Sequence, residues 1–253
     1  MSLVVGRVTE TLQQSNSCLL SGLDGSCKPY VVSQLMQNLG QKLVYLAGEI
    51  EEAYDIARSL RGILGAEAVT VLPPKNFLAR ESEAHSHDNL ERMTFFSELL
   101  EHPRRTGVLV MSATSLLFET IPPELYRASA IRIAAGSTID MEELLAGLVN
   151  AGYVRQSLVD GPGQFSVRGG IIDIFPVRMR EPIRMEMFGD EVESLRRFAP
   201  DTQRSTRKLK SVNIWPARET SGEGGRVWQY LAAEWPIWVD DLTRFRESWL
   251  THL

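Results

Sequence analysis

Three short, almost wholly apolar runs, separated by helical patterns, constrain most strongly what this chain can fold into. They lie at residues 43–46, 69–72 and 108–111. Apolar residues at helical spacing follow the first run and precede the third. Strands that are apolar on both sides form parallel sheets covered by helices. We therefore predict an α/β fold built on a parallel sheet, with a further strand at 18–20 leading into a helix over 31–39.

The second half of the chain follows a different pattern. Asp140 and Glu143 have capping-box spacing and predict a helix that ends near Ala151. Alternating apolar and polar residues then predict antiparallel strands, at 164–175, 183–188 and 192–198. We expect Gly169 and Gly170 to form a bulge and Gly189 to lie in a turn.

This change of pattern predicts a smaller α+β domain inserted into the α/β domain. The expected boundaries are 1–120 for the first part of the α/β domain, 121–208 for the inserted domain, and 209–253 for the return to the first domain. A strand at 212–216 is expected to belong to that return.

Composition places the chain among soluble globular proteins, with 43% hydrophobic and 23% charged residues. No run approaches the roughly 20 apolar residues of a membrane span, and no signal peptide is evident. Cys18 and Cys27 are the two cysteines, too few for a disulfide framework, so we expect a cytoplasmic protein. His85, His87 and Asp88 have no second ligand cluster, so no metal site is expected.

The charge is unevenly distributed. The whole chain carries a formal charge of −5, which argues against a surface that binds nucleic acid throughout. Residues 153–210 contain 11 Lys and Arg against 8 Asp and Glu, whereas the remainder contains 16 against 24. The central segment is therefore the candidate for contact with an acidic partner.

A Gly-rich stretch between the strand expected at 18–20 and the next helix resembles a phosphate-binding loop. Gly22 and Lys28 keep the separation of the G-x-x-x-x-G-K-[ST] motif, with Gly25 between them. Cys27 replaces the last glycine and Pro29 replaces the hydroxyl residue. A Cβ at 27 crowds the approach to phosphate, and Pro29 offers neither a hydroxyl for Mg²⁺ nor a backbone N–H. We expect a degenerate, P-loop-NTPase-like domain that binds no nucleotide and needs no cofactor.

Two observations bear on that expectation. An ATPase needs a carboxylate for Mg²⁺ at a later strand end, but the run at 108–111 leads into Ser112, Ala113 and Thr114. Asp240 and Asp241 follow another apolar run and are interpreted as a solvated strand end. An ordinary strand-turn-helix with Pro29 in the first helical turn explains the same residues, and a working phosphate site remains the alternative.

An ordered series of motifs in the central segment resembles a known family. The segments are 152–155 (GYVR), 161–176 (GPGQFSVRGGIIDIFP), 183–191 (IRMEMFGDE) and 201–205 (DTQRS). They resemble the region shared by the excision-repair helicase UvrB and the transcription-repair coupling factor, Mfd. In both, this small domain docks the damage-recognition ATPase UvrA.

The broken loop favours the coupling factor, because UvrB has an intact phosphate loop. UvrB also has a tyrosine-rich DNA-clamping hairpin, whereas residues 76–89 contain no tyrosine. Ser166 stands where UvrB usually carries an arginine, and residues 201–205 resemble the coupling factor's own motif. A UvrB-like, ATP-dependent DNA clamp remains the alternative.

The resemblance implies a non-catalytic adaptor that docks UvrA through Arg155, Arg168 and Arg184, with Phe175 as an apolar neighbour. Arginine forks pair with carboxylates, and arginine beside an aromatic ring is common in interface hot spots. Full-length members are DNA translocases whose further domains contact RNA polymerase and DNA. Those domains are absent here, which indicates a fragment or a stand-alone relative. The alternative is that these arginines bind no partner and are solvated or paired within the chain with Glu186, Asp190 or Glu191.

Overall fold

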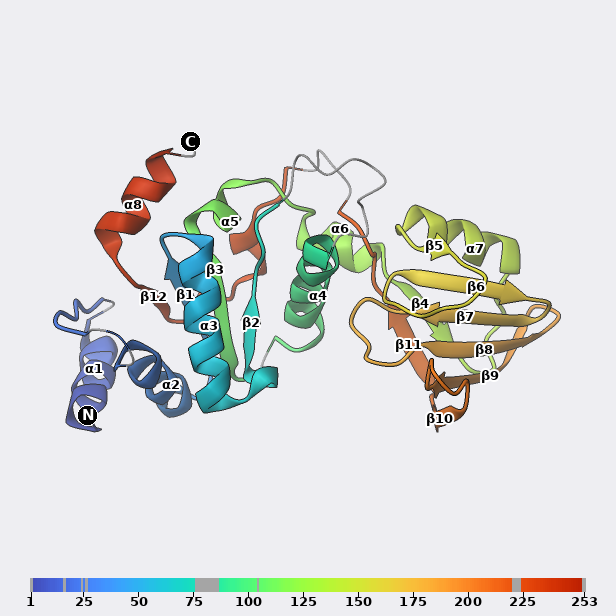
Figure 1. The fold of residues 1–253 in the computed structure, drawn as a ribbon, viewed down its shortest axis with the longest axis horizontal. Helices are drawn as coiled ribbons and strands as arrows, with labels where there is room; N and C mark the ends of the chain where they lie inside the picture. Colours follow the sequence, from blue (N-terminus) through green and yellow to red (C-terminus); the bar gives the residue numbers. More distant parts are fainter. Residues whose placement is uncertain are drawn as a thin grey trace. The chain divides into compact units, whose positions relative to one another are not determined.

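The computed structural model has a mixed α/β fold in two compact units (Figure 1). It describes residues 2–15, 17–23, 25, 27–75, 87–103, 105–219 and 224–251. Unit 1 contains Met1–Pro74, His102–Phe118 and Leu231–Leu253; unit 2 contains Lys75–Glu101 and Glu119–Tyr230.

Unit 1 is built on a four-stranded, wholly parallel sheet in the order β12-β1-β3-β2. The strands are β1 (Lys42–Ala47), β2 (Val69–Val71), β3 (Gly107–Ser112) and β12 (Ile237–Val239). Every residue of the central strand β3 is buried. The parallel sheet predicted from the apolar runs is thus confirmed, because a strand covered on both faces needs apolar residues throughout.

Helices pack on this sheet, and α3 (Ile50–Leu64) runs alongside its strands and contacts β1, β2 and β3 (Figure 1). The α3 helix buries Ala53, Ala57 and Leu60, and a capping box of Glu49 and Glu52 fixes its start. The other helices of unit 1 are α1 (Ser2–Gln14), α2 (Cys27–Leu39), η1 (Ala66–Ala68), α5 (Ala113–Leu117) and α8 (Leu242–Thr251).

The strand predicted at residues 18–20 is wrong. These residues have no regular secondary structure, and Leu19 is 90% exposed. The position beside β1 is instead taken by β12, through pairs such as Val44 with Ile237. The helix that precedes this stretch, α1, was not predicted, although Val5 and Val8 are buried one helical turn apart.

Unit 2 contains a six-stranded sheet in the order β10-β9-β8-β7-β6-β5. Its strands are β5 (Val154–Arg155), β6 (Gln164–Arg168), β7 (Ile171–Phe175), β8 (Ile183–Phe188), β9 (Glu191–Phe198) and β10 (Ser205–Lys208). All neighbours are antiparallel except β5 and β6. One face buries an apolar core that includes Phe165, Ile172, Ile174, Ile183 and Met185.

The helices of unit 2 are α4 (His87–Glu101), α6 (Pro123–Ala128), α7 (Met141–Asn150) and η3 (Val227–Tyr230). The α7 helix confirms the helix predicted before Ala151, since the Asp140 carboxylate accepts the backbone N–H of Glu143 at 2.9 Å. The expected strand near 212–216 is β11 (Ser211–Ile214), which pairs with β4 (Ile131–Ala134) in unit 2. It does not join the sheet of unit 1, which was its expected place. The domain boundaries after residues 120 and 208 stay predictions.

Two tight turns close the hairpins at one end of the large sheet. Gly169 and Gly170 lie between the paired residues Arg168 and Ile171, so they form a turn and the predicted bulge is wrong. The turn predicted at Gly189 is confirmed. The register shift of the sheet lies between β8 and β9 instead, next to Met187. A Cβ on Gly170 would lie 2.8 Å from the Met187 carbonyl oxygen, so glycine permits the close approach of the two hairpins.

Candidate protein-docking site

The Gly-rich stretch leads into α2, which begins at Cys27, four residues before the helix predicted over 31–39. Gly22 and Gly25 have φ of 77° and 54°, a conformation that favours glycine. The helix begins at Cys27, which is exposed, and Pro29 is buried in its first turn. Because proline has no N–H, the helix start has one donor fewer for an anion.

Lys28, the lysine of the phosphate-loop pattern, has an internal partner. Its ammonium lies 2.8 Å from Oδ1 of Asp240, with side-chain exposures of 29% and 17%. Asp240 follows β12, and its backbone N–H donates to Leu46 of the neighbouring strand. Burial and the Asp240 carboxylate raise the pKa of the Tyr45 hydroxyl, so Tyr45 stays neutral. Asp240 is therefore an ion-pair partner rather than the solvated strand end that the sequence suggested.

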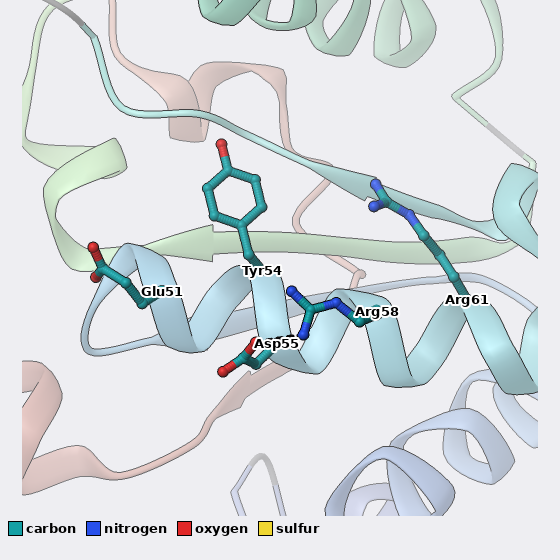
Figure 2. Close-up of a pocket in the computed structure, with 5 residues that line it drawn as sticks. All are labelled: Glu51, Tyr54, Asp55, Arg58 and Arg61. Carbon is teal, nitrogen blue, oxygen red and sulfur yellow. Dashed lines mark hydrogen bonds and ion pairs between the residues drawn. The ribbon is translucent and has the colours of Figure 1, made fainter.

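A shallow depression of about 460 Å³ lies on the exposed side of α3 (Figure 2). Figure 2 shows that its labelled lining residues all come from this one helix: Glu51, Tyr54, Asp55, Arg58 and Arg61. Arg58 pairs with Asp55 at 3.0 Å, and both side chains are more than 70% exposed. Arg61 donates to the Val69 carbonyl oxygen. The four charged lining residues are exposed, whereas Tyr54 is partly buried against the core. The five residues bring no nucleophile together with a base.

The residues considered for a metal site lie outside the described part of the chain: His85 as a whole, and the side chains of His87 and Asp88. Within the described ranges, no three His, Cys, Asp or Glu side chains are grouped as metal ligands would be. No helix in the described part of the chain has the length and apolar character needed to cross a membrane.

The outer face of the large sheet in unit 2 carries the polar residues of the central motifs. We call it the polar face and define it by Arg168, Asp173, Arg184, Glu186 and Phe188. Strand alternation turns these side chains away from the apolar core, because Ile183 and Met185 between them are fully buried. Asp173 stands in register with Arg184, and Ile171 with both Arg168 and Glu186.

Asp173 is the centre of this face and is only 1% exposed. Arg184 donates from Nε to Oδ1 at 2.7 Å and from Nη2 to Oδ2 at 2.8 Å. Arg168 donates from Nη2 to the same Oδ2 at 2.7 Å. The hydrogen bond to Asp173 raises the pKa of Arg184. One buried carboxylate thus holds two arginines from the strands on either side of it.

Arg184 is largely enclosed by its neighbours. Its Nη2 also donates to Oε1 of Gln203 at 2.8 Å, and its guanidinium carbon lies 4.4 Å from the centre of the Phe198 ring. The side chain points away from the core, but these partners leave it only 14% exposed. The internal partner is Asp173 rather than Glu186, Asp190 or Glu191.

The other predicted contact residues have different environments. Arg168 is 49% exposed, and Arg155 is exposed on the edge strand β5. The β5–β6 register puts Arg155 beside Phe165, a residue of the core face, so the structure does not bring it onto the polar face. Phe175 is 6% exposed and supports the sheet more than it offers apolar surface.

Glu186 forms a second charged cluster on the polar face. Its carboxylate accepts from the Ser194 hydroxyl at 2.7 Å and pairs with Arg196. The hydrogen bond from Ser194, followed by the charge of Arg196, lowers the pKa of Glu186. Its charge is therefore kept at neutral pH.

Sequence reasoning missed three residues of this site: Asp173, Gln203 and Phe188. Asp173 is the one polar residue of the strand IIDIF, and a buried charge in such a strand requires partners. Phe188 is 80% exposed at the end of β8, two positions beyond Glu186. Its alternation with Arg184 and Glu186 was a signal that it faces away from the core.

Comparison with known proteins identifies the same part of the chain. Residues 131–219 match the UvrB interaction domain family. The transcription-repair-coupling factor of Bacillus subtilis (strain 168) is 32% identical over 203 residues, which cover 79% of this chain and 17% of that protein. That of Myxococcus xanthus is 33% identical over 221 residues, covering 84% and 18%. That of Staphylococcus aureus (strain Mu50 / ATCC 700699) is 30% identical over 213 residues, covering 84% and 18%.

The chain spans less than a fifth of the length of these curated relatives. The matched family segment contains the whole polar face and Gln203. Over about four fifths of its length, the chain belongs to the transcription-repair-coupling factor family, as a segment that carries the UvrB interaction domain.

Proposed function

We propose that this chain is a non-catalytic adaptor module that docks the excision-repair protein UvrA. In a full-length coupling factor, it would bring UvrA to a stalled RNA polymerase on DNA. The observation that carries the proposal is the polar face, which lies within the segment that matches the UvrB interaction domain.

The exposed residues of the polar face suit a docking role. Arg168 presents half of its side chain to solvent, and Phe188 presents most of its ring near the same turn end of the sheet. Exposed arginine and aromatic residues are enriched among those that dominate binding energy. Arg155 would contribute from the sheet edge, whereas Arg184 and Phe175 would support the face from within.

Titration of the chain with purified UvrA, followed by calorimetry, tests this proposal. Arg168→Ala is expected to weaken binding about 10-fold or more, as loss of a charge-assisted contact does. Arg207→Ala is the matched control, because Arg207 is an exposed arginine on the edge strand β10 of the same sheet. Equal affinities of wild type, Arg168→Ala and Arg155→Ala would refute this site.

We also propose that the loop at residues 22–29 is a degenerate phosphate loop that binds no nucleotide. Three features support this: the Cβ of Cys27 where the motif has glycine, the missing N–H of Pro29, and the ion pair of Lys28 with Asp240. A phosphate would have to compete with a carboxylate already 2.8 Å from the lysine.

The competing function is a UvrB-like, ATP-dependent DNA clamp. Calorimetric titration with ATP and Mg²⁺ separates the two, since a clamp must bind nucleotide. Saturable binding at micromolar ATP would contradict the adaptor, and its absence in a chain that still binds UvrA would support it.

A further inference from the structure

We infer that Asp173 is a positioning residue of the docking site: with Arg184 and Gln203, it holds the exposed guanidinium of Arg168 in one orientation. The inference rests on the proposed function and gives it a mechanism. In this arrangement Arg168 contacts the partner, and Arg184 acts as an internal brace, meaning that it holds the Asp173 carboxylate in place.

The hydrogen-bond geometry gives the two arginines different roles: Arg184 fixes the Asp173 carboxylate, and Arg168 is held by it. Arg184 occupies Oδ1 of Asp173 and shares Oδ2, at 2.7 and 2.8 Å, so two parallel bonds fix the plane of the carboxylate. Arg168 then reaches Oδ2 with a single Nη2 at 2.7 Å. Because Arg184 is 14% exposed and Arg168 is 49% exposed, only Arg168 offers its guanidinium to a partner.

Gln203 holds the brace from the other side. Its side chain is fixed at both ends, since Oε1 accepts from Arg184 at 2.8 Å and Nε2 donates to the Pro200 carbonyl oxygen at 2.7 Å. Its φ of 57° lies in the left-handed region, which side chains other than glycine and asparagine rarely adopt. Such a conformation persists where surrounding contacts hold it. The DTQRS motif thus contributes to this site through Gln203, which contacts Arg184 rather than Arg168 itself.

A fixed guanidinium binds more tightly than a free one. An exposed arginine samples many rotamers, and a partner that immobilises it loses part of the binding energy as side-chain entropy. Holding one such side chain in place beforehand improves affinity by about threefold to tenfold. Arg168 gains this benefit only while Asp173 is charged and is itself held by Arg184.

A double-mutant cycle with UvrA tests the inference. Asp173→Asn keeps the shape of the side chain but weakens the three hydrogen bonds from the two arginines. It is expected to lower affinity about threefold to tenfold. In an Arg168→Ala background, Asp173→Asn is expected to change affinity by less than about twofold, because the group it positions is gone. An equal effect in both backgrounds would overturn the inference, since it would mean a general structural role.

A second measurement is independent of UvrA, and the backbone signals of the same spectra show whether each variant is folded. In ¹⁵N NMR spectra of the free chain, the Arg168 side-chain N–H should give a dispersed, slowly exchanging signal in the wild type. That signal should collapse toward the position of Arg207 in Asp173→Asn, and broaden in Gln203→Gly, whose backbone accepts the left-handed conformation. An Arg168 signal unchanged in both variants would sink the inference, whether or not UvrA binds.

The two claims can fail separately. If the wild-type chain does not bind UvrA, the proposed function falls, and the NMR comparison alone decides whether Asp173 positions Arg168. If UvrA binds and depends on Arg168, but Asp173→Asn binds as the wild type does, the proposed function stands and the positioning role is refuted.

Discussion

The Lys28 ammonium and the Asp240 carboxylate lie 2.8 Å apart and join the start of α2 to the end of β12. The two residues are 212 positions apart in the chain. In unit 1, the lysine that the phosphate-loop pattern would assign to a ligand thus has a structural partner.

This pair predicts a measurable stability contribution. Asp240→Asn is expected to lower the free energy of unfolding by about 1 kcal/mol, because both groups are less than a third exposed and lose a charge partner. Urea unfolding of Lys28→Ala, Asp240→Asn and the double variant checks this. Fully additive losses would contradict an interaction between the two side chains.

Arg184 and Arg168 share Asp173 but should differ in their effect on folding. Arg184→Ala leaves a 1% exposed carboxylate with one arginine fewer and is expected to cost about 3 kcal/mol. Arg168→Ala removes a half-exposed pair and should cost less than about 1 kcal/mol. Urea unfolding of the whole chain compares the two variants. A larger loss of unfolding free energy in Arg168→Ala than in Arg184→Ala would contradict the role of Arg184 as a brace.

The lowered pKa of Glu186 leads us to expect a smaller free energy of unfolding in acid. Its pKa is lowered in the folded chain by Ser194 and Arg196, so the folded state binds fewer protons than the unfolded state. The resulting stability is fully present above the unfolded pKa of glutamate, about 4.3, and is lost as the pH falls through the lower folded pKa. Unfolding free energies of wild type and Glu186→Gln should therefore differ more at pH 6 than at pH 3. The same difference at both pH values would argue against this account.

The turn of the β6–β7 hairpin should tolerate change at one glycine and not at the other. Gly169 has φ of 59° and open space around its Cβ position, so Gly169→Asn should be nearly neutral. In Gly170→Ala, the new Cβ would lie 2.8 Å from the backbone oxygen of Met187 and force the hairpins apart. A cost of about 1–3 kcal/mol is expected from such overpacking. Thermal unfolding of the two variants measures the contrast, and equal melting temperatures would disprove it.

Phe188 offers a test of the docking site that does not depend on charge. Phe188→Ser should leave the fold intact, because the ring is 80% exposed, and should weaken UvrA binding about 10-fold or more if the ring is an anchor. Leu158→Ser is a control, as this residue is also exposed in unit 2. Calorimetric titration measures both variants, and equal affinities would remove Phe188 from the proposed site.

Much of the fold could be predicted from local pattern. The strands β1, β2 and β3 follow from apolar runs, because a strand covered on both faces admits few polar residues. The hairpin strands β8 and β9 follow from alternation, and α7 follows from its Asp140 cap. The apolar run at 18–20 led to a wrong prediction, because a strand also needs a neighbouring strand to pair with. The position beside β1 is occupied by β12.

The sequence by itself determined which way Arg184 points, because Ile183 and Met185 on either side must be buried. Alternation specifies a face but not what lies on it. Only the tertiary structure decided that Asp173, Gln203 and Phe198 gather around Arg184, because each comes from a different part of the chain. The same holds for Lys28 and Asp240, whose separation in sequence hides their contact. Composition and motif indicated the segment proposed to dock a partner, and long-range packing left Arg168 half exposed while enclosing Arg184.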